Sequence, residues 1–282
     1  MIEDHDFDVL DIHQHMGSTG DAHGFVTEGQ VSGADVNSTE VAARLEFMAQ
    51  AKIRQAVAIP GHNYNRAAGA RATHAENEAI ARYRAALPGQ FPVAVGIVEP
   101  LDQQAAVEEL DRIVELGLKG VSFHTEFGGV TIDSPWMMKI LERMGELDLV
   151  PLIHASNVVL HEALWRLGKV ARALPDLQIV ALEPFYTFDG LQECFFIADV
   201  APNVIFDTAS CSVNELMIEF ARQFGAERVA YGSQYYSQLR RPGQLRLTRA
   251  TLVLRDIIAT ERLSAADKQL ILGGNARRVF GL

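Results

Sequence analysis

Two histidines close to the N-terminus have the spacing of a metal-binding pair. His13 and His15 are two residues apart in a short apolar run, and side chains two apart on a strand point to the same face. Both imidazoles can then reach one ion at about 2.0–2.2 Å. Asp11 has the same parity and is expected to orient a ligand or a neighbouring group. The alternative is that both histidines are merely buried and hydrogen-bonded.

Further polar residues occur where other strand-like runs end. Such runs lead to His62, Glu99, His124, His154, Glu183, Asp207 and Gln234. Random placement of nine histidines would seldom bring one to the same end of four strands in eight. The predicted metal ligands are His13, His15, His62, His124, His154 and Glu183. His124 has the alternative of a hydrogen-bonding pocket residue, and Glu99 and Asp207 are expected to close strand ends or hold loops.

Strand-like and helix-like segments alternate along the chain. Apolar, β-rich runs predict strands at residues 7–12, 55–59, 92–98, 120–123, 150–153, 178–182, 204–206 and 228–231. Amphipathic patterns predict helices at residues 39–51, 73–86, 103–116, 134–147, 158–173, 190–200, 213–224 and 245–259, with an extra helix within 265–280. Asn37 and Glu40 have the spacing of a capping box for the first helix.

This alternation predicts an α/β fold, a (β/α)8 TIM-like barrel that spans residues 1–282 as one domain. An open doubly wound sheet is the main rival, but no glycine-rich phosphate motif follows the first strand. In such a barrel the chemistry lies at the C-terminal ends of the strands. The histidines and carboxylates described above would therefore meet at one end of the barrel.

The composition excludes several classes of partner. The formal net charge of −11 disfavours nucleic acid and anionic membranes, and no apolar run reaches the ~18 residues that a spanning helix needs. Cys194 and Cys211 lack CxxC spacing, and they indicate reduced structural thiols in a cytoplasmic protein. The expected partner is a small-molecule substrate, and a homodimer is compatible with the sequence.

Several motifs together resemble one known family. They are DxHxH at residues 11–15, KGVSFH at 119–124, PLIHA at 151–155, RVAYGS at 228–233 and ILGGNARRVFGL at 271–282. The chain resembles the amidohydrolase superfamily almost end to end, and most of all the branch with small hydrolases and metal-dependent decarboxylases of aromatic or unsaturated acids. The resemblance implies an amidohydrolase-type barrel with a metal ion held by His13, His15 and His154.

Two positions depart from that pattern. The family normally ends the sixth strand in a histidine, where this chain has Glu183, and the eighth strand in GSD, where this chain has Gln234. An amide cannot act as a general base near neutral pH. Ordinary hydrolysis by a metal-bound hydroxide therefore lacks its usual base. Glu183 and Gln234 are the predicted catalytic positions.

Three functions remain open. The favoured one is a nonheme dinuclear iron monooxygenase that hydroxylates a bulky, terpenoid-like acyl or CoA ester, because many imidazoles with carboxylates suit two iron ions and the superfamily includes such a branch. The second is a zinc or manganese hydrolase or decarboxylase of a small carboxylic acid that uses Glu183 as the base. The third is a non-catalytic amidohydrolase-like binding protein.

Aromatic and basic residues near the ends of the sixth and eighth strands are candidates for substrate binding. They are Tyr186, Tyr235, Tyr236, Arg240 and Arg241. The tyrosines would line a pocket for a bulky apolar group, and the arginines would bind an anionic group. The alternative is that the tyrosines only pack and that the arginines are solvated.

Overall fold

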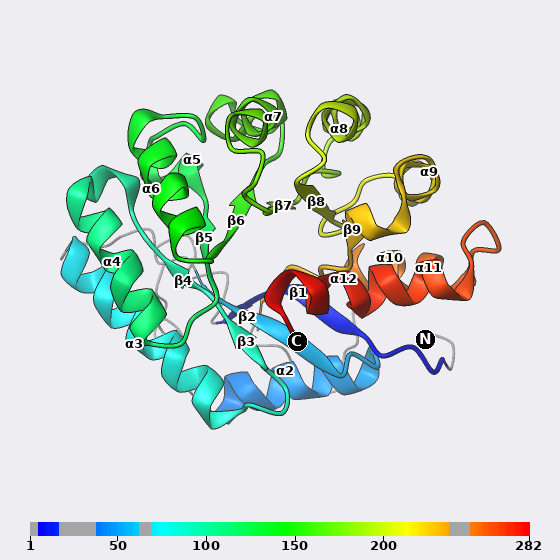
Figure 1. Cartoon of the computed structure of the whole chain (residues 1–282). Helices are drawn as coiled ribbons and strands as arrows, with labels where there is room; N and C mark the ends of the chain where they lie inside the picture. The colour runs from blue at the N-terminus through cyan, green and yellow to red at the C-terminus, as the bar shows by residue number, and fades with distance from the viewer. Residues whose placement is uncertain (1–4, 17–37, 62–68, 237–248) are drawn as a thin grey trace.

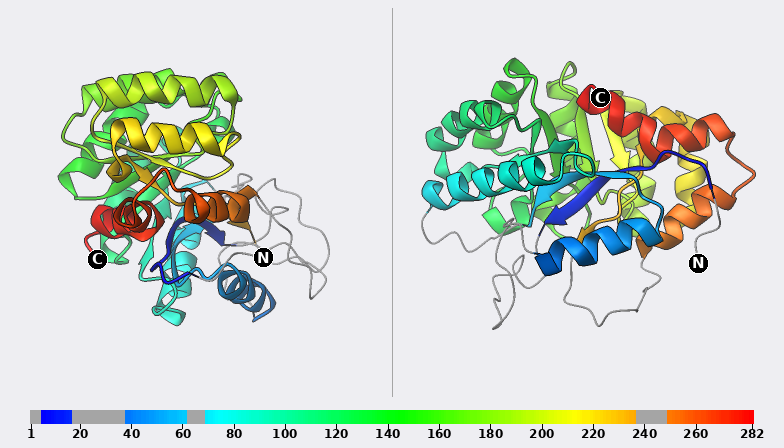
Figure 2. Two further views of the ribbon diagram at one scale, coloured as in Figure 1. Left: turned by 90° about the vertical axis from the view of Figure 1, so that its right-hand side faces the viewer. Right: turned by 90° about the horizontal axis from the view of Figure 1, so that it is seen from below.

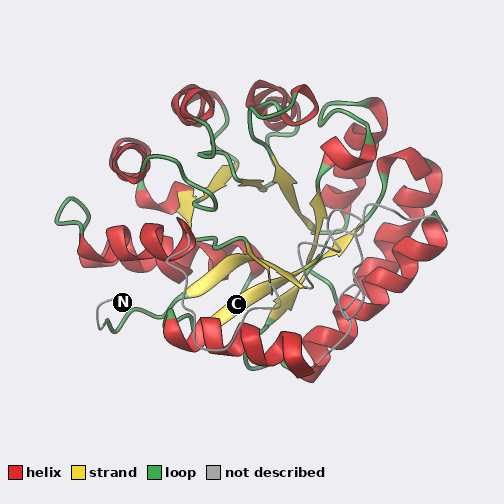
Figure 3. Ribbon diagram, turned by 180° about the vertical axis from the view of Figure 1, so that it is seen from behind, coloured by secondary structure: helices red, strands yellow, loops and turns green. Residues whose placement is uncertain are grey.

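The structure is a computed structural model, and it describes residues 5–16, 38–61, 69–236 and 249–282. Parallel strands form a ring with helices around the outside (Figure 1). The strands are β1 Leu10–Met16, β2 Gln55–Pro60, β3 Val93–Ala94, β4 Gly96–Ile97, β5 Gly120–Phe123, β6 Val150–His154, β7 Ile179–Leu182, β8 Val204–Asp207, β9 Val229–Ala230 and β10 Tyr235–Tyr236. The view from behind shows the strands inside and the helices outside (Figure 3).

Two interruptions divide this ring into two sheets, and main-chain hydrogen bonds bridge both. The sheets have the orders β10-β1-β2-β3 and β4-β5-β6-β7-β8-β9. Between β3 and β4, the Val95 N–H donates to the carbonyl of Ala58 at 3.0 Å. At the second interruption, the N–H of Ile12 in β1 donates to the carbonyl of Tyr231, the residue after β9, at 2.9 Å. The predicted (β/α)8 barrel is therefore confirmed. Its third strand is interrupted between β3 and β4, and its closing seam, where β1 meets the eighth strand formed by β9 and β10, is slightly irregular.

Most of the predicted helices are present. The helices are α2 Ser38–Gln50, α3 Ala70–Ala86, α4 Gln104–Glu115, α5 Thr125–Gly128, α6 Pro135–Glu146, α7 Leu164–Ala173, α8 Phe188–Val200, α9 Asn214–Phe224, α10 Arg249–Ala259, α11 Ala265–Gln269 and α12 Asn275–Phe280. Figure 2 shows α8 and α9 lying side by side on the outside of the barrel. None of the helices described here is long and apolar enough to cross a membrane.

The predicted helix at residues 158–173 is wrong in its first turns. A short 3-10 turn, Leu160–Glu162, precedes α7. The predicted helix within 265–280 is confirmed as α11 and α12, joined by a π-helical turn at Leu270–Gly274. The predicted capping box cannot be followed at Asn37, which lies outside the described residues, and the Glu40 side chain is engaged by Arg44 and Tyr83.

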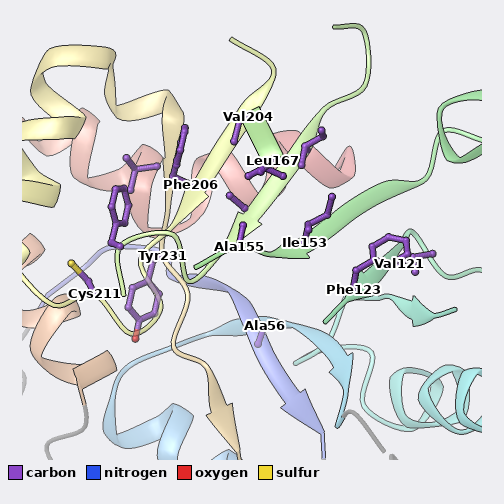
Figure 4. Packing of buried hydrophobic residues seen from close by; sticks show 14 of the residues in the cluster. Ala56, Val121, Phe123, Ile153, Ala155, Leu167, Val204, Phe206, Cys211 and Tyr231 are labelled. Atoms are coloured by element: carbon purple, nitrogen blue, oxygen red, sulfur yellow. The ribbon is translucent and has the colours of Figure 1, made fainter. Parts of the chain in front are cut away.

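The strands are buried on both faces, which explains their continuous apolar runs. Side chains that point into the barrel include Leu152 and Val180, whereas their neighbours Ile153 and Ala181 pack outward against the helices. Figure 4 shows part of this outer layer, including Ile153, Ala155 and Leu167 of α7. His154 has the same parity as Leu152 and therefore points into the barrel, one layer nearer the mouth.

Strand β1 contains a register shift that bears on the histidine pair. Asp11 is opposite Ala56 and Gln14 is opposite Ala58, so three steps along β1 match two steps along β2. Such a bulge re-aims the side chains that follow it. The observed strand begins at Leu10, three residues after the start of the strand predicted at residues 7–12, and it continues through His13 and His15.

Candidate functional site

Three buried histidines meet at the C-terminal mouth of the barrel. His13 and His15 come from β1 and His154 from β6, and one ring nitrogen of each lies within 4.8 Å of the others. The Nε2 atoms of His13 and His15 are 2.9 Å apart. The side chains of all three are almost wholly excluded from solvent. The structure thus joins the three residues that the family resemblance marked as ligands.

The other ring nitrogens fix how these imidazoles face. The Nδ1 of His13 is 2.6 Å from Asp207 Oδ2, that of His15 is 3.1 Å from the Pro60 carbonyl, and that of His154 is 2.9 Å from the Phe123 carbonyl. Each partner is an acceptor, so each Nδ1 carries the proton and donates it. Each neutral ring then presents the lone pair of Nε2, which is the form that binds metal.

Two lone pairs 2.9 Å apart repel each other unless a cation lies between them. Nitrogens bound about 2.0–2.2 Å from one ion are roughly 3 Å apart when they meet it at a right angle, so the residues fit a metal ion. In the protein alone a proton can take that place. Burial lowers the pKa of His13, but the charge and hydrogen bond of Asp207 together with the charges of Glu183 and Asp11 outweigh it, so the net pKa is raised. Burial and His13 hold the pKa of His15 well below its usual value.

Asp207 is a functional residue that the sequence interpretation underrated. It was expected to close a strand end or hold a loop, and it does both while also binding a ligand ring. Its Oδ2 accepts from His13, and its Oδ1 accepts from the main-chain N–H of Glu183 at 2.7 Å. A Cβ at Gly232 would lie 2.7 Å from Asp207 Oδ2 and 2.9 Å from the His13 Cβ. The close approach of this pair therefore requires glycine at that position.

Asp11 acts on the main chain and not on a ligand ring. Its Oδ1 accepts from the N–H groups of His13 and Ser233, at 3.0 and 2.9 Å, and its Oδ2 accepts from the Gln14 side chain at 2.9 Å. The expectation that Asp11 orients a neighbouring group is correct in outcome. The parity argument behind it fails, because the bulge in β1 separates Asp11 from the histidines.

A second group of polar side chains lies beside the histidines, after β7, β8 and β9. Ser210 Oγ is 3.1 Å from Glu183 Oε1 and 2.5 Å from Gln234 Oε1. Burial raises the pKa of Glu183, and this effect outweighs the nearby charge of His13, which lowers it. All three residues have positive φ, at 58°, 55° and 52° for Glu183, Ser210 and Gln234. Both predicted catalytic positions are thus joined through one serine.

His124 and Glu183 are not among the three histidines whose nitrogens lie together. His124 Nδ1 lies 2.7 Å from Glu162 Oε1, in a second cluster that includes Glu126 and that could also hold a metal ion. The His124 ring stacks on His154, with centroids 4.1 Å apart. Whether His124 or Glu183 binds an ion stays a prediction, and His62 lies outside the described residues.

The two adjacent tyrosines of β10 face opposite ways. The Tyr236 ring stacks on His15 at 4.5 Å, and burial raises the pKa of its phenol. The Tyr235 hydroxyl donates to the Ala43 carbonyl at 3.2 Å, and its ring stacks on Phe47. Tyr235 therefore packs against α2, away from the histidines, contrary to the predicted role in substrate binding.

The remaining candidates for substrate binding differ in what the structure says of them. Tyr186 is exposed just after β7, and its contact with substrate stays a prediction. Arg240 and Arg241 lie outside the described residues.

These observations define a class of protein: a (β/α)8 barrel with three histidines at the C-terminal ends of its strands that fit a metal ion. The family model described as amidohydrolase matches residues 11–282. The chain belongs to the amidohydrolase family, and it is a metal-dependent enzyme of that fold. No curated protein matched the sequence.

Solved structures with the same fold include decarboxylases and a hydratase. One is 2,6-dihydroxybenzoate decarboxylase from Rhizobium, with a TM-score of 0.71, 17% identity, and 98% of this chain and 99% of that chain covered. A dihydroxybenzoic acid decarboxylase from Polaromonas with bound manganese has a TM-score of 0.69, 17% identity and 98% of both chains covered. 4-Oxalomesaconate hydratase from Rhodopseudomonas palustris has a TM-score of 0.68, 17% identity, and 97% and 95% covered.

These similarities establish the fold and leave the three functions of the sequence interpretation open. The three structures just named are decarboxylases and a hydratase at 17% identity. A divalent metal is supported, and one of the similar structures holds manganese. Iron as the metal, and a second ion, stay predictions without support.

Proposed function

We propose that this protein is a divalent-metal-dependent decarboxylase of a small aromatic or unsaturated carboxylic acid, with Glu183 as the proton donor. The observation that carries this proposal is the double contact of Asp207. One carboxylate binds the ring of His13 and the main chain of Glu183, so it holds a metal ligand and an acid in a fixed relation. The decarboxylases of similar fold support the same reaction type.

The chemistry of Gln234 favours decarboxylation over hydrolysis. Hydrolysis at a metal centre needs a base that takes a proton from water, and an amide cannot serve. Decarboxylation needs an acid that gives a proton to carbon. Burial raises the pKa of Glu183, and a carboxyl group with a raised pKa is more often protonated near neutral pH, as such an acid must be.

A bound divalent metal would be held by His13, His15 and His154 and would orient and polarise the substrate carboxylate and a neighbouring oxygen. Glu183 gives its proton to the carbon that bears the carboxylate. The bond between that carbon and the carboxylate then breaks, and its electron pair returns to the unsaturated system as CO2 leaves. Glu183 regains a proton from solvent.

The walls of the site fit an unsaturated body next to the carboxylate. Tyr236 stacks on His15, and Phe127 contacts the His124 ring edge-to-face with centroids 4.5 Å apart. Phe127 and Tyr186 are both partly exposed at the mouth. Flat apolar groups pack well on such rings.

The test is a panel of hydroxybenzoates and unsaturated acids, incubated with Mn²⁺ or Zn²⁺ in D2O. The expected result is release of CO2 with one deuterium at the carbon that carried the carboxylate, at equal rates with and without dioxygen. Product that forms only with oxygen and a reductant would restore the iron monooxygenase. Cleavage of esters or amides without CO2 release would establish the hydrolase alternative instead.

A further inference from the structure

A buried cation on the outer side of β1 has no part in the chemistry proposed so far. Arg44 of α2 is fully excluded from solvent. Its Nε donates to Glu40 Oε1 at 2.9 Å, and Glu40 Oε2 accepts from the Tyr83 hydroxyl at 2.9 Å. The charge is therefore compensated on the helix side. A buried ion pair adds little stability over apolar packing. The pairing of Arg44 with Glu40 therefore does not explain why Arg44 is buried, and its contacts with β1 matter more.

Arg44 also donates hydrogen bonds to β1, the strand that carries His13 and His15. Its Nη2 donates to the main-chain carbonyl of His15 at 2.5 Å, and its Nη1 donates to Gln14 Oε1 at 3.0 Å. The same Gln14 donates to Asp11 Oδ2. The guanidinium thus holds β1 immediately after the bulge that turns the histidines into the barrel.

These contacts extend across the closing seam of the barrel. Asp11 accepts from the Ser233 N–H at 2.9 Å, so the relay from Arg44 reaches the chain that leads to Gln234. The Arg44 guanidinium also lies over the Tyr235 ring at 4.9 Å. Because β1 and β10 pair in parallel at His15 and Tyr236, one side chain of α2 contacts both strands of the seam. Figure 2 shows α2 running along the outside of β1.

We infer that Arg44 is a positioning residue for the metal centre: its guanidinium fixes the main chain of β1 at His15 and the closing seam, so that the imidazoles of β1 meet His154. The inference uses the metal site of the proposed function and does not depend on the reaction that the site performs. The planar fork of arginine suits this task, because it reaches two acceptors at fixed angles. A lysine keeps the charge but replaces the fork with a single point.

The test measures binding of Mn²⁺ and of Zn²⁺ to the folded apoprotein by competition with a chelator, without substrate. Arg44→Lys is expected to weaken metal binding about tenfold, in the range seen when outer partners of metal ligands are removed. Gln14→Met breaks the relay to Asp11 while leaving the Arg44–Glu40 pair, and it should weaken binding in the same direction. This second variant keeps the test decisive if the first does not fold.

Tyr83→Phe is the matched control. It removes one hydrogen bond to Glu40 and leaves every contact between Arg44 and β1, so metal binding should stay within about twofold while thermal stability falls slightly. A purely structural role would lower the melting temperature of Arg44→Lys and Gln14→Met with unchanged metal affinity, and this result would overturn the inference. Wild-type protein that binds neither ion would overturn it too, whereas metal binding without CO2 release would contradict only the proposed reaction.

Discussion

Two groups of residues at the barrel mouth are built in different ways. The first group, called the histidine side here, consists of His13, His15 and His154, which lie within β1 and β6, with each ring fixed by an acceptor behind it. The second group, called the acid side, includes Glu183, directly after β7, and Gln234, directly before β10, and both have left-handed backbone conformations. The histidine side holds its ligands within strands, whereas the acid side aims its groups from unusual backbone conformations.

Part of the backbone strain of this protein gathers at the acid side. A non-glycine residue with positive φ costs about 1–3 kcal/mol when the surroundings impose it. Glu183, Ser210 and Gln234 adopt such values side by side and contact one another. Their surroundings must therefore hold them firmly, and such strain is often found at active sites. Asp207 links the two sides.

The largest effect is expected when two ligands of the histidine side are removed. His13→Ala combined with His15→Ala should remove the bound metal and lower turnover by about 10³-fold, because a metal ion contributes several kcal/mol to such reactions. The barrel should stay folded, since the site lies above the packed core. Elemental analysis and circular dichroism measure both outcomes. Unchanged metal content in the double variant would contradict the three-histidine centre.

The next largest effect is expected from a substitution on the acid side alone. Glu183→Gln keeps the size and removes the proton, so kcat should fall about 10²- to 10⁴-fold while Mn²⁺ affinity stays nearly constant. The wild-type kcat/KM should also fall as pH rises through the raised pKa of Glu183, because only the protonated carboxyl donates. Lost metal binding in this variant would show that Glu183 is a ligand.

Asp207→Asn tests the link between the sides. The amide keeps the shape but loses the charge that faces the His13 ring, and such changes weaken metal binding about 10- to 100-fold. Asp133→Asn is the matched control, because Asp133 pairs with Arg166 and Lys169 on the outside of the barrel. Chelator competition measures both variants. Equal affinities in the two would reduce Asp207 to a loop-holding residue.

The smallest effect is expected when a second charge is added on the acid side. Gln234→Glu places a negative charge on the other side of Ser210 from Glu183. A like charge favours the protonated form of Glu183 and raises its pKa further. The fall of kcat/KM at high pH should therefore move to higher pH, with little change in metal affinity. Gln192→Glu on the exposed surface of α8 adds the same charge and should not move the profile.

Local pattern was sufficient for much of the fold. Continuous apolar runs mark strands that are buried on both faces, and the structure confirms strands such as β5 and β6 within one residue of the predicted ends. The prediction failed where backbone geometry is irregular. The helix expected from residue 158 begins only at Leu164, because its first turns form the 3-10 segment whose Glu162 contacts His124.

The sequence likewise predicted only part of the candidate site. His13 and His15 could be paired from their spacing, and His154 could be added from its place at a strand end. Tyr235 and Tyr236 could not be told apart, although the strand alternation puts one against α2 and the other on His15. The parity of Asp11 gave a false equivalence with the histidines, because nothing in the sequence marks the bulge.

The sequence by itself determined the barrel class, the three imidazoles and the absence of the usual strand-eight carboxylate, because periodicity and residue chemistry are local properties. Only the tertiary structure decided which nitrogens face one another, that Asp207 holds both His13 and Glu183, and that Arg44 binds β1 from the outer side. The contacts of Asp207 and Arg44 join residues that are from 24 to 194 positions apart in the chain. Their geometry depends on how the barrel closes, which no local pattern encodes.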